Sequence, residues 1–194
     1  MARQRLSSTE RRAQIAEAAL RLLAERGARG LTAAALGAEV GLKDASLFKH
    51  FSDMGAIVAA AVDRFEAWLA DSLDRPEAEP LARLGGFFVH RQALLRARPE
   101  ILRLAFDDRL VEAAAPADRD RVRAILARSR ALILDCLTAA RAAGAVRADV
   151  PLEALQWTVM GAMRGAALHP DPPPPDAVWA DILTLISPPD GDDR

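Results

Sequence analysis

The sequence contains no tyrosine, one cysteine, three histidines and only two lysines, although 26 of its 194 residues are Lys or Arg. The single cysteine, Cys136, excludes an internal disulfide and fits a reducing compartment. No apolar run approaches the roughly 18 residues that a membrane-spanning helix needs. The N-terminal stretch "MARQRLSSTERR" lacks the apolar segment of a secretory signal. We therefore expect a cytoplasmic protein that has no membrane partner.

The same scarcity argues against most kinds of catalytic or metal site. The histidines, His50, His90 and His169, are too scattered to predict a metal site. No nucleophile–base motif, glycine-rich phosphate loop or paired-cysteine spacing is present. Cys136 has no basic neighbour in sequence that would activate it, so we interpret it as an inert core thiol. A small helical enzyme is therefore disfavoured, and no cofactor is expected.

Alanine, arginine and leucine dominate the composition instead, and these residues favour helices. Runs of β-branched residues are few, which disfavours a sheet. Ser7 and Glu10 form a capping box before the first apolar helical pattern, and Asp53 can cap a later one. The spacing predicts an all-α fold of about nine helices, at about 8–27, 33–39, 44–50, from 53 onward, 80–97, 99–113, 117–143, 151–168 and 176–187.

Charge divides the chain into a basic head and an acidic body. Residues 1–50 hold nine basic and five acidic residues, a net charge of +4, whereas the remainder carries −5. The stretch "DSLDRPEAEP" has the prolines and charges of a linker. We predict a head over 1–52, a helical body over 53–188 and a disordered tail over 189–194. The basic head indicates a polyanionic partner.

Both lysines lie in one segment, "GLKDASLFKHF", which spans residues 41–51. Two short helices joined by a glycine-containing turn, with a longer helix before them, describe a helix-turn-helix. In that unit the second helix enters the DNA major groove. Lys43 and Lys49 flank this helix, where they can reach phosphates or a guanine edge, while Leu47 and Phe51 hold it to the scaffold.

Residues 11–62, with the run "AALRLLAERGARGLTAAALGAEVGLKDASLFKHFSDMGAI", resemble the DNA-binding domain of the TetR/AcrR repressors. The resemblance implies a homodimeric transcriptional regulator of the repressor type. Its head would bind a near-palindromic double-stranded DNA operator, and its body would dimerise and hold a small ligand. Ala45 and Phe48 stand where that family usually has Gly and Tyr, Gly37 replaces the usual Ala, and Met54 replaces a usual Lys.

Six residues of the head are predicted to contact DNA: Thr32, Lys43, Ser46, Phe48, Lys49 and His50. The alternative for the two lysines and the histidine is a solvated polar face. Thr32 is also a helix N-cap, whichever role it has. A further group of arginines near the N-terminus is either a basic arm that reaches DNA or a frayed terminus; it comprises Arg3, Arg5, Arg11 and Arg12.

The body carries large apolar side chains on different predicted helices, with a few polar residues among them. We predict that they line a cavity for an apolar small-molecule effector, and the set is Trp68, Phe87, His90, Arg103, Phe106, Trp157 and Met160. A filled helical core would use the same apolar residues. The alternative function is therefore a regulator whose body is a constitutive or protein-docking dimerisation module without an effector.

Gly161 and Gly165 lie four residues apart, a spacing that lets helix backbones approach closely. Aliphatic and aromatic residues near them suggest a helix-pairing surface: Trp157, Leu168, Trp179, Ile182, Leu183 and Ile186. In the resembled family the last two helices form a four-helix dimer bundle. The alternative for this set is packing within one chain.

Overall fold

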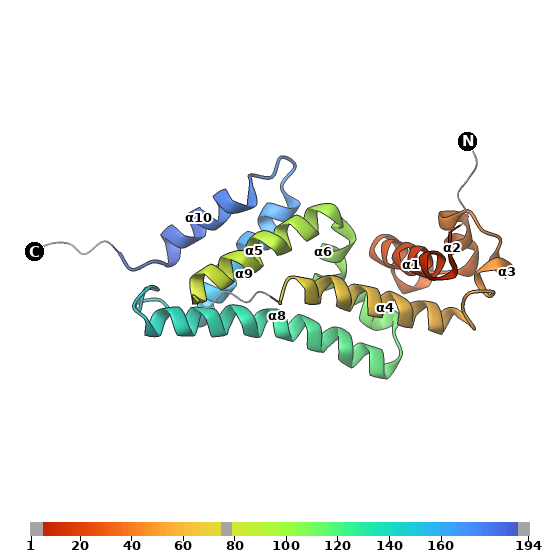
Figure 1. The fold of residues 1–194 in the computed structure, drawn as a ribbon, viewed down its shortest axis with the longest axis horizontal. Helices are drawn as coiled ribbons and strands as arrows, with labels where there is room; N and C mark the ends of the chain where they lie inside the picture. The colour runs from red at the N-terminus through yellow and green to blue at the C-terminus, as the bar shows by residue number, and fades with distance from the viewer. Residues whose placement is uncertain (1–5, 75–78, 190–194) are drawn as a thin grey trace, which may run out of the picture. The chain divides into compact units, whose positions relative to one another are not determined.

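The computed structural model describes residues 6–74 and 79–189, and within these ranges every regular element is a helix (Figure 1). The all-α prediction is confirmed. The described helices are α1 (Ser8–Gly30), α2 (Ala33–Val40), α3 (Asp44–Leu47), α4 (Met54–Asp71), α5 (Pro80–Ala97), α6 (Pro99–Phe106), α7 (Arg109–Ala113), α8 (Pro116–Ala142), α9 (Leu152–Leu168) and α10 (Pro175–Ile186). Most of the predicted 189–194 tail lies outside the described residues.

The described residues contain one helix more than predicted, because the segment 99–113 is broken into α6 and α7. The prediction of one helix there was wrong. Asp107 and Asp108 lie at the break, and the Asp107 carboxylate accepts a hydrogen bond from Arg109 Nε at 2.6 Å. Aspartate hydrogen-bonds nearby groups in non-helical conformations and so competes with the helix. The predicted helix 44–50 is also shorter, since it ends at Leu47 and continues as a turn.

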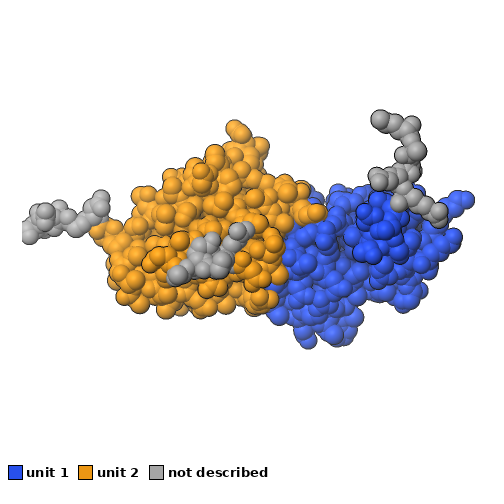
Figure 2. Space-filling model, in the orientation of Figure 1, with its two compact units in different colours: residues 1–68, 100–125 blue, residues 69–99, 126–194 orange. Residues whose placement is uncertain are grey.

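Two compact units make up the chain, and Figure 2 shows them in different colours. Unit 1 comprises residues 1–68 and 100–125, and unit 2 comprises residues 69–99 and 126–194. Their bounds fall within α4, at the start of α6 and within α8 rather than at the predicted division after residue 52. The predicted division into a DNA-binding head and an effector body concerns function, and it stays a prediction.

Unit 1 is built around α1, which packs against α2 and α7. The capping box forms, with Ser7 N donating to Glu10 Oε2 at 2.8 Å and Glu10 N donating to Ser7 Oγ at 3.2 Å. The regular part of α1 ends at Gly27, whose φ of 68° leaves the helical region. The predicted apolar stripe is at most 1% exposed; it consists of Ile15, Ala18, Ala19, Leu22 and Leu23.

Ion pairs join α4 to its neighbours in unit 1. Arg64 donates to Glu17 of α1, with Nη2 and Oε1 2.7 Å apart. Arg121 of α8 pairs with Asp63 of α4 at 2.7 Å, and this hydrogen bond is the main cause that raises the pKa of Arg121. These partly exposed pairs fix geometry more than they add stability. They join α4 to α1 and to the part of α8 that belongs to unit 1.

Unit 2 is built around α5, which contacts α9 and α10. Phe87 and Phe88 on α5 are at most 1% exposed. The Phe88 ring lies 5.7 Å from the Trp179 ring, measured between centroids. Trp179 also covers Gly85, where an added Cβ would lie 2.5 Å from the indole Nε1. Gly85 is therefore the position on α5 that lets α10 approach.

Gly85→Val should destabilise the protein, because the valine Cβ would overlap the Trp179 ring. Overpacking of this kind typically costs about 1–3 kcal/mol of unfolding free energy. Urea unfolding measures the loss, and tryptophan emission reports whether the indole has moved. Ala82→Val, on the exposed side of the same helix, is the matched control. Equal stability of the two variants would show that Trp179 does not pack on α5 in solution.

Candidate nucleic-acid interface

The turn between α2 and α3 is tight, and two glycines permit it. Gly41 adopts the left-handed conformation, with φ 68° and ψ 36°, and ends α2. Leu42 N donates to Gly37 O at 2.8 Å. A Cβ on Gly37 would lie 2.7 Å from Leu42 O, so this glycine leaves room for the turn. Leu47 and Phe51 are 0% and 3% exposed, as predicted for residues that hold α3 to the rest of the unit.

The side chains predicted to meet DNA lie on the outside of this unit. Lys43 and Lys49 are exposed, and Phe48 is 43% exposed. Ser46 and His50 are half-buried. Apart from Thr32, these residues occupy a stretch of eight residues that contains the short α3 and its following turn. The structure thus brings the predicted cations to one short exposed segment, and their contact with DNA stays a prediction.

Two flanking caps fix the helices beside α3. Thr32 Oγ1 accepts a hydrogen bond from Ala35 N at 3.1 Å, which confirms its N-cap role for α2. Asp53 Oδ1 accepts one from Ala56 N at 2.8 Å at the start of α4. This backbone hydrogen bond is the main cause that lowers the pKa of the Asp53 carboxyl. Both caps therefore satisfy amide groups at helix starts.

Arg12 has a role that the sequence did not indicate. Its Nη1 donates to the backbone carbonyl of His50, and its guanidinium lies 4.1 Å from the centre of the Phe51 ring. Arg11, by contrast, donates to Gln14 Oε1 at 2.6 Å within α1. Arg3 and Arg5 of the predicted arm lie outside the described residues. Arg12 thus ties α1 to the end of the α3 turn across 38 positions of sequence.

Arg12→Met should weaken operator binding by about 1 kcal/mol, roughly fivefold, because the α3 turn loses a hydrogen bond and a cation–π contact. The slope of log affinity against log salt should stay unchanged, since a positioning residue neutralises no phosphate. Arg11→Met is the matched control. Affinity measured over a salt series checks this; a slope reduced by about one would instead make Arg12 a phosphate contact.

The residues predicted to line an effector cavity have different surroundings in the two units. In unit 1, Trp68 is 8% exposed, Phe106 is 44% exposed and Arg103 is exposed. In unit 2, the Phe87 side chain is buried, Met160 and His90 are half-buried, and Trp157 is 69% exposed. His90 Nε2 lies 2.6 Å from Asp71 Oδ2. Phe106 and Trp157 contribute little to the core of the single chain, and the lining role of the set stays a prediction.

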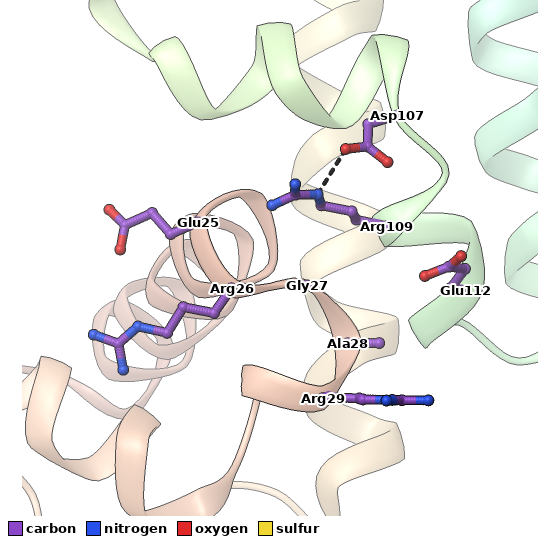
Figure 3. A pocket seen from close by; sticks show the side chains of 8 residues that line it. All are labelled: Glu25, Arg26, Gly27, Ala28, Arg29, Asp107, Arg109 and Glu112. Atoms are coloured by element: carbon purple, nitrogen blue, oxygen red, sulfur yellow. Dashed lines mark hydrogen bonds and ion pairs between the residues drawn. The ribbon is translucent and has the colours of Figure 1, made fainter.

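A polar pocket of about 500 Å³ lies in unit 1, beside the break in α1 (Figure 3). Three arginines and three acidic residues line it together with Gly27 and Ala28: Glu25, Arg26, Arg29, Asp107, Arg109 and Glu112. Arg109 Nη1 donates to Ala24 O at 2.8 Å, which satisfies a carbonyl of the last regular turn of α1. The equal numbers of opposite charges favour a structural junction between α1 and α7.

Other kinds of site find no support in the described ranges. No three side chains of His, Cys, Asp or Glu type are grouped there as metal ligands. Within residues 6–74 and 79–189, none of the helices combines the length and the apolar character needed to cross a membrane. The exposed segment around α3 therefore remains the strongest candidate site.

Residues 15–61 match the family model for the tetR family of bacterial regulatory proteins. This segment of the chain is therefore similar to the tetR family of regulators. The matched range includes α2, α3 and the turn between them. None of the curated proteins is significantly similar to the chain in sequence.

Solved structures share the fold of nearly the whole chain. The ketosteroid transcriptional regulator KstR2 of Mycobacterium tuberculosis is 22% identical, with a TM-score of 0.76 over 96% of this chain and 98% of that one. AibR, in complex with isovaleryl coenzyme A and operator DNA, is 18% identical, with a TM-score of 0.71 over 92% and 100%. FadR of Bacillus subtilis, in complex with stearoyl-CoA, is 14% identical, with a TM-score of 0.58 over 89% and 95%. At these identities the likeness concerns the fold.

Proposed function

We propose that the chain binds a near-palindromic operator as a homodimer and represses transcription until a small-molecule effector releases it from DNA. It would act in the cytoplasm. The observation that carries the DNA-binding part is the exposure of Lys43, Phe48 and Lys49 around α3, within a helix-turn-helix whose apolar residues are buried. Exposed lysine ammonium groups suit phosphates and guanine edges in a major groove.

A stripe of α9 supports the homodimer. Trp157, Gly161, Gly165 and Leu168 recur at spacings of three and four residues, and all are exposed in the single chain. A Cβ added at either glycine would meet nothing within 4 Å. The stripe thus combines large apolar side chains with positions where another helix can approach closely. A second copy of the chain, related by a two-fold axis, would cover the same stripe on both partners.

Part of the predicted helix-pairing surface packs within the single chain instead. Ile182 and Ile186 of α10 are at most 2% exposed in the single chain, and Trp179 packs on α5. These residues support the alternative of packing within one chain. Leu185 of α10 is 58% exposed and remains available to a partner. We therefore assign the dimer surface to the α9 stripe and the exposed side of α10.

Two of the structural relatives have acyl-coenzyme A molecules bound, which supports a ligand-responsive body here. A ligand that prefers the arrangement unable to bind DNA shifts the population away from the operator. The second candidate, a constitutive or protein-docking dimerisation module, is favoured by the buried apolar core of unit 2, where Phe87 and Phe88 are at most 1% exposed.

Genomic pull-down with the purified protein tests the DNA-binding part. We expect recovered fragments to share a near-palindromic site that the protein protects in footprinting. Titration of the bound operator with isovaleryl-CoA and stearoyl-CoA then tests ligand release. Recovery of random fragments only would contradict operator recognition. A specific operator that stays bound throughout a broad ligand panel would favour the constitutive alternative.

A further inference from the structure

Unit 2 contains a few buried polar side chains at the end of α4 and on α5. Among the described residues, those classed as buried and polar or charged are Ser72, Arg91 and Gln92. Arg91 and Gln92 are consecutive on α5, and Ser72 follows the end of α4. Arginine is almost never fully buried unless it is paired with an anion. A 5% exposed Arg91 in an apolar core therefore needs an explanation.

The partners of Arg91 are all uncharged. Nε donates to Ser72 Oγ at 2.8 Å, while Nη2 donates to Leu69 O at 3.0 Å and to Ser129 Oγ at 3.3 Å. The guanidinium also lies 5.0 Å from the centre of the Phe87 ring. No Asp or Glu of the described residues pairs with it. Burial lowers the pKa of Arg91 to about 10, so the side chain remains a cation at neutral pH.

These contacts leave part of the guanidinium unused. A guanidinium has five N–H donors, and Nη1 carries two of them. Among the described residues, Nη1 donates no hydrogen bond. The adjacent Gln92 is 0% exposed, and its Oε1 atom has no hydrogen-bond partner there, although Nε2 donates to Met163 O at 2.5 Å. Two consecutive residues of α5 thus carry a polar atom that has no hydrogen-bond partner among the described residues, and of these two atoms Gln92 Oε1 is buried.

A structural role accounts for only part of this arrangement. Leu69 O belongs to the last turn of α4, and a cation near a helix C-terminus is favourable. The helix terminus, however, carries only about half a negative charge. The three hydrogen bonds of Arg91 use only the N–H groups of Nε and Nη2. Asp71, the residue before Ser72, pairs with His90 instead. A unit positive charge therefore remains uncompensated beside an aromatic wall.

We propose that Arg91 binds the carboxylate of an apolar organic acid and that this acid is the effector of the proposed regulator. A monocarboxylate matches one guanidinium in charge and accepts its N–H donors in a planar, bidentate arrangement. A phosphate group or the polyphosphate of coenzyme A would bring excess negative charge into the core. The acid's apolar body would lie against Phe87, which is 1% exposed.

The same contacts connect the acid to α4, the helix that also belongs to unit 1. A carboxylate that pairs with the guanidinium competes with Leu69 O, Ser72 and Ser129 for its donors. Binding would therefore change how Arg91 holds the last turn of α4. Because this inference rests on the proposed function, acid binding and operator release have to be measured separately.

Calorimetry with the full chain compares octanoate with 1-octanol and 3-phenylpropionate with 3-phenylpropanol. Each pair keeps the apolar body and removes the charge. We expect at least one acid to bind about 10- to 100-fold more tightly than its alcohol, as a buried charge-assisted hydrogen bond implies. Arg91→Met should abolish this preference. Arg83→Met, an exposed arginine on the same helix, should leave it unchanged.

Circular dichroism establishes that each variant is folded, and Arg91→Gln, which keeps two amide donors without the charge, replaces Arg91→Met if the latter fails to fold. Equal binding of acids and alcohols, an acid preference that survives the loss of Arg91, or no acid binding would each overturn the inference. If octanoyl-CoA binds wild type and Arg91→Met equally well while octanoate binds neither, the coenzyme A group is what the protein recognises. This result would also overturn the inference.

Operator retention, measured in parallel, separates this inference from the proposed function. Acids that bind through Arg91 and release the operator support both. Acids that bind through Arg91 while the operator stays bound support the carboxylate site and contradict ligand control. Neutral ligands that release the operator equally well in wild type and Arg91→Met support ligand control and contradict the carboxylate site.

Discussion

Gly161→Leu is expected to convert the proposed dimer into a monomer and to lower operator affinity by about 100-fold or more. The leucine would project from the exposed stripe of α9, where close approach of a partner helix requires a small residue. A monomer reads only one half-site, so it loses the gain in effective concentration that links two heads on one operator. Light scattering reports the oligomeric state, and an equilibrium DNA-binding assay reports the affinity.

The structure makes this variant informative, because an added Cβ at Gly161 meets nothing within 4 Å in the single chain. The monomer should therefore fold normally, and its helical circular dichroism should match that of wild type. Ala139→Leu, on an exposed position of α8, is the control for an added surface leucine. A Gly161→Leu protein that remains dimeric and binds the operator normally would place the interface on another surface.

The parts of the fold that the sequence predicts are those governed by local chemistry. The capping box at Ser7 and the glycine-containing turn at Gly41 each act within a few residues, and both form as expected. The break at Asp107 was missed because apolar residues continue on both sides of it, from Leu104 to Leu110. An apolar pattern does not reveal whether one helix or two short ones bury it.

The candidate DNA site was predictable for the same reason, since the residues around Lys49 lie in one short segment. The contacts that position this segment were not. Arg12 donates to the His50 carbonyl across 38 residues, and Trp179 of α10 packs on Gly85 of α5, which is far from it in sequence. The burial of Arg91 could not be predicted from the sequence, because arginine usually lies at the surface. Such contacts depend on which helices pack together, and the spacing of residues along one helix does not predict this.

Lys49→Ala is expected to weaken operator binding and to lower the salt dependence of binding without disturbing the fold. Lys49 is exposed and forms no hydrogen bond or ion pair with the described residues, so the free protein loses no stabilising contact. Its ammonium group, two residues after the buried Leu47 that anchors α3, is available to a phosphate or a base edge. Each lost phosphate contact lowers the slope of log affinity against log salt by roughly one.

Affinity for the recovered operator, measured over a series of salt concentrations, separates the two possible contacts of Lys49. A phosphate contact gives uniform weakening across operator variants and a slope reduced by about one. A base contact gives a relaxed preference at one base pair, which costs about 1–3 kcal/mol there. Arg128→Ala, which removes an exposed cation of α8 outside the head, should change neither quantity. If Lys49→Ala behaves like Arg128→Ala in both respects, Lys49 belongs to a solvated face, and Lys43 becomes the remaining lysine through which α3 can meet DNA.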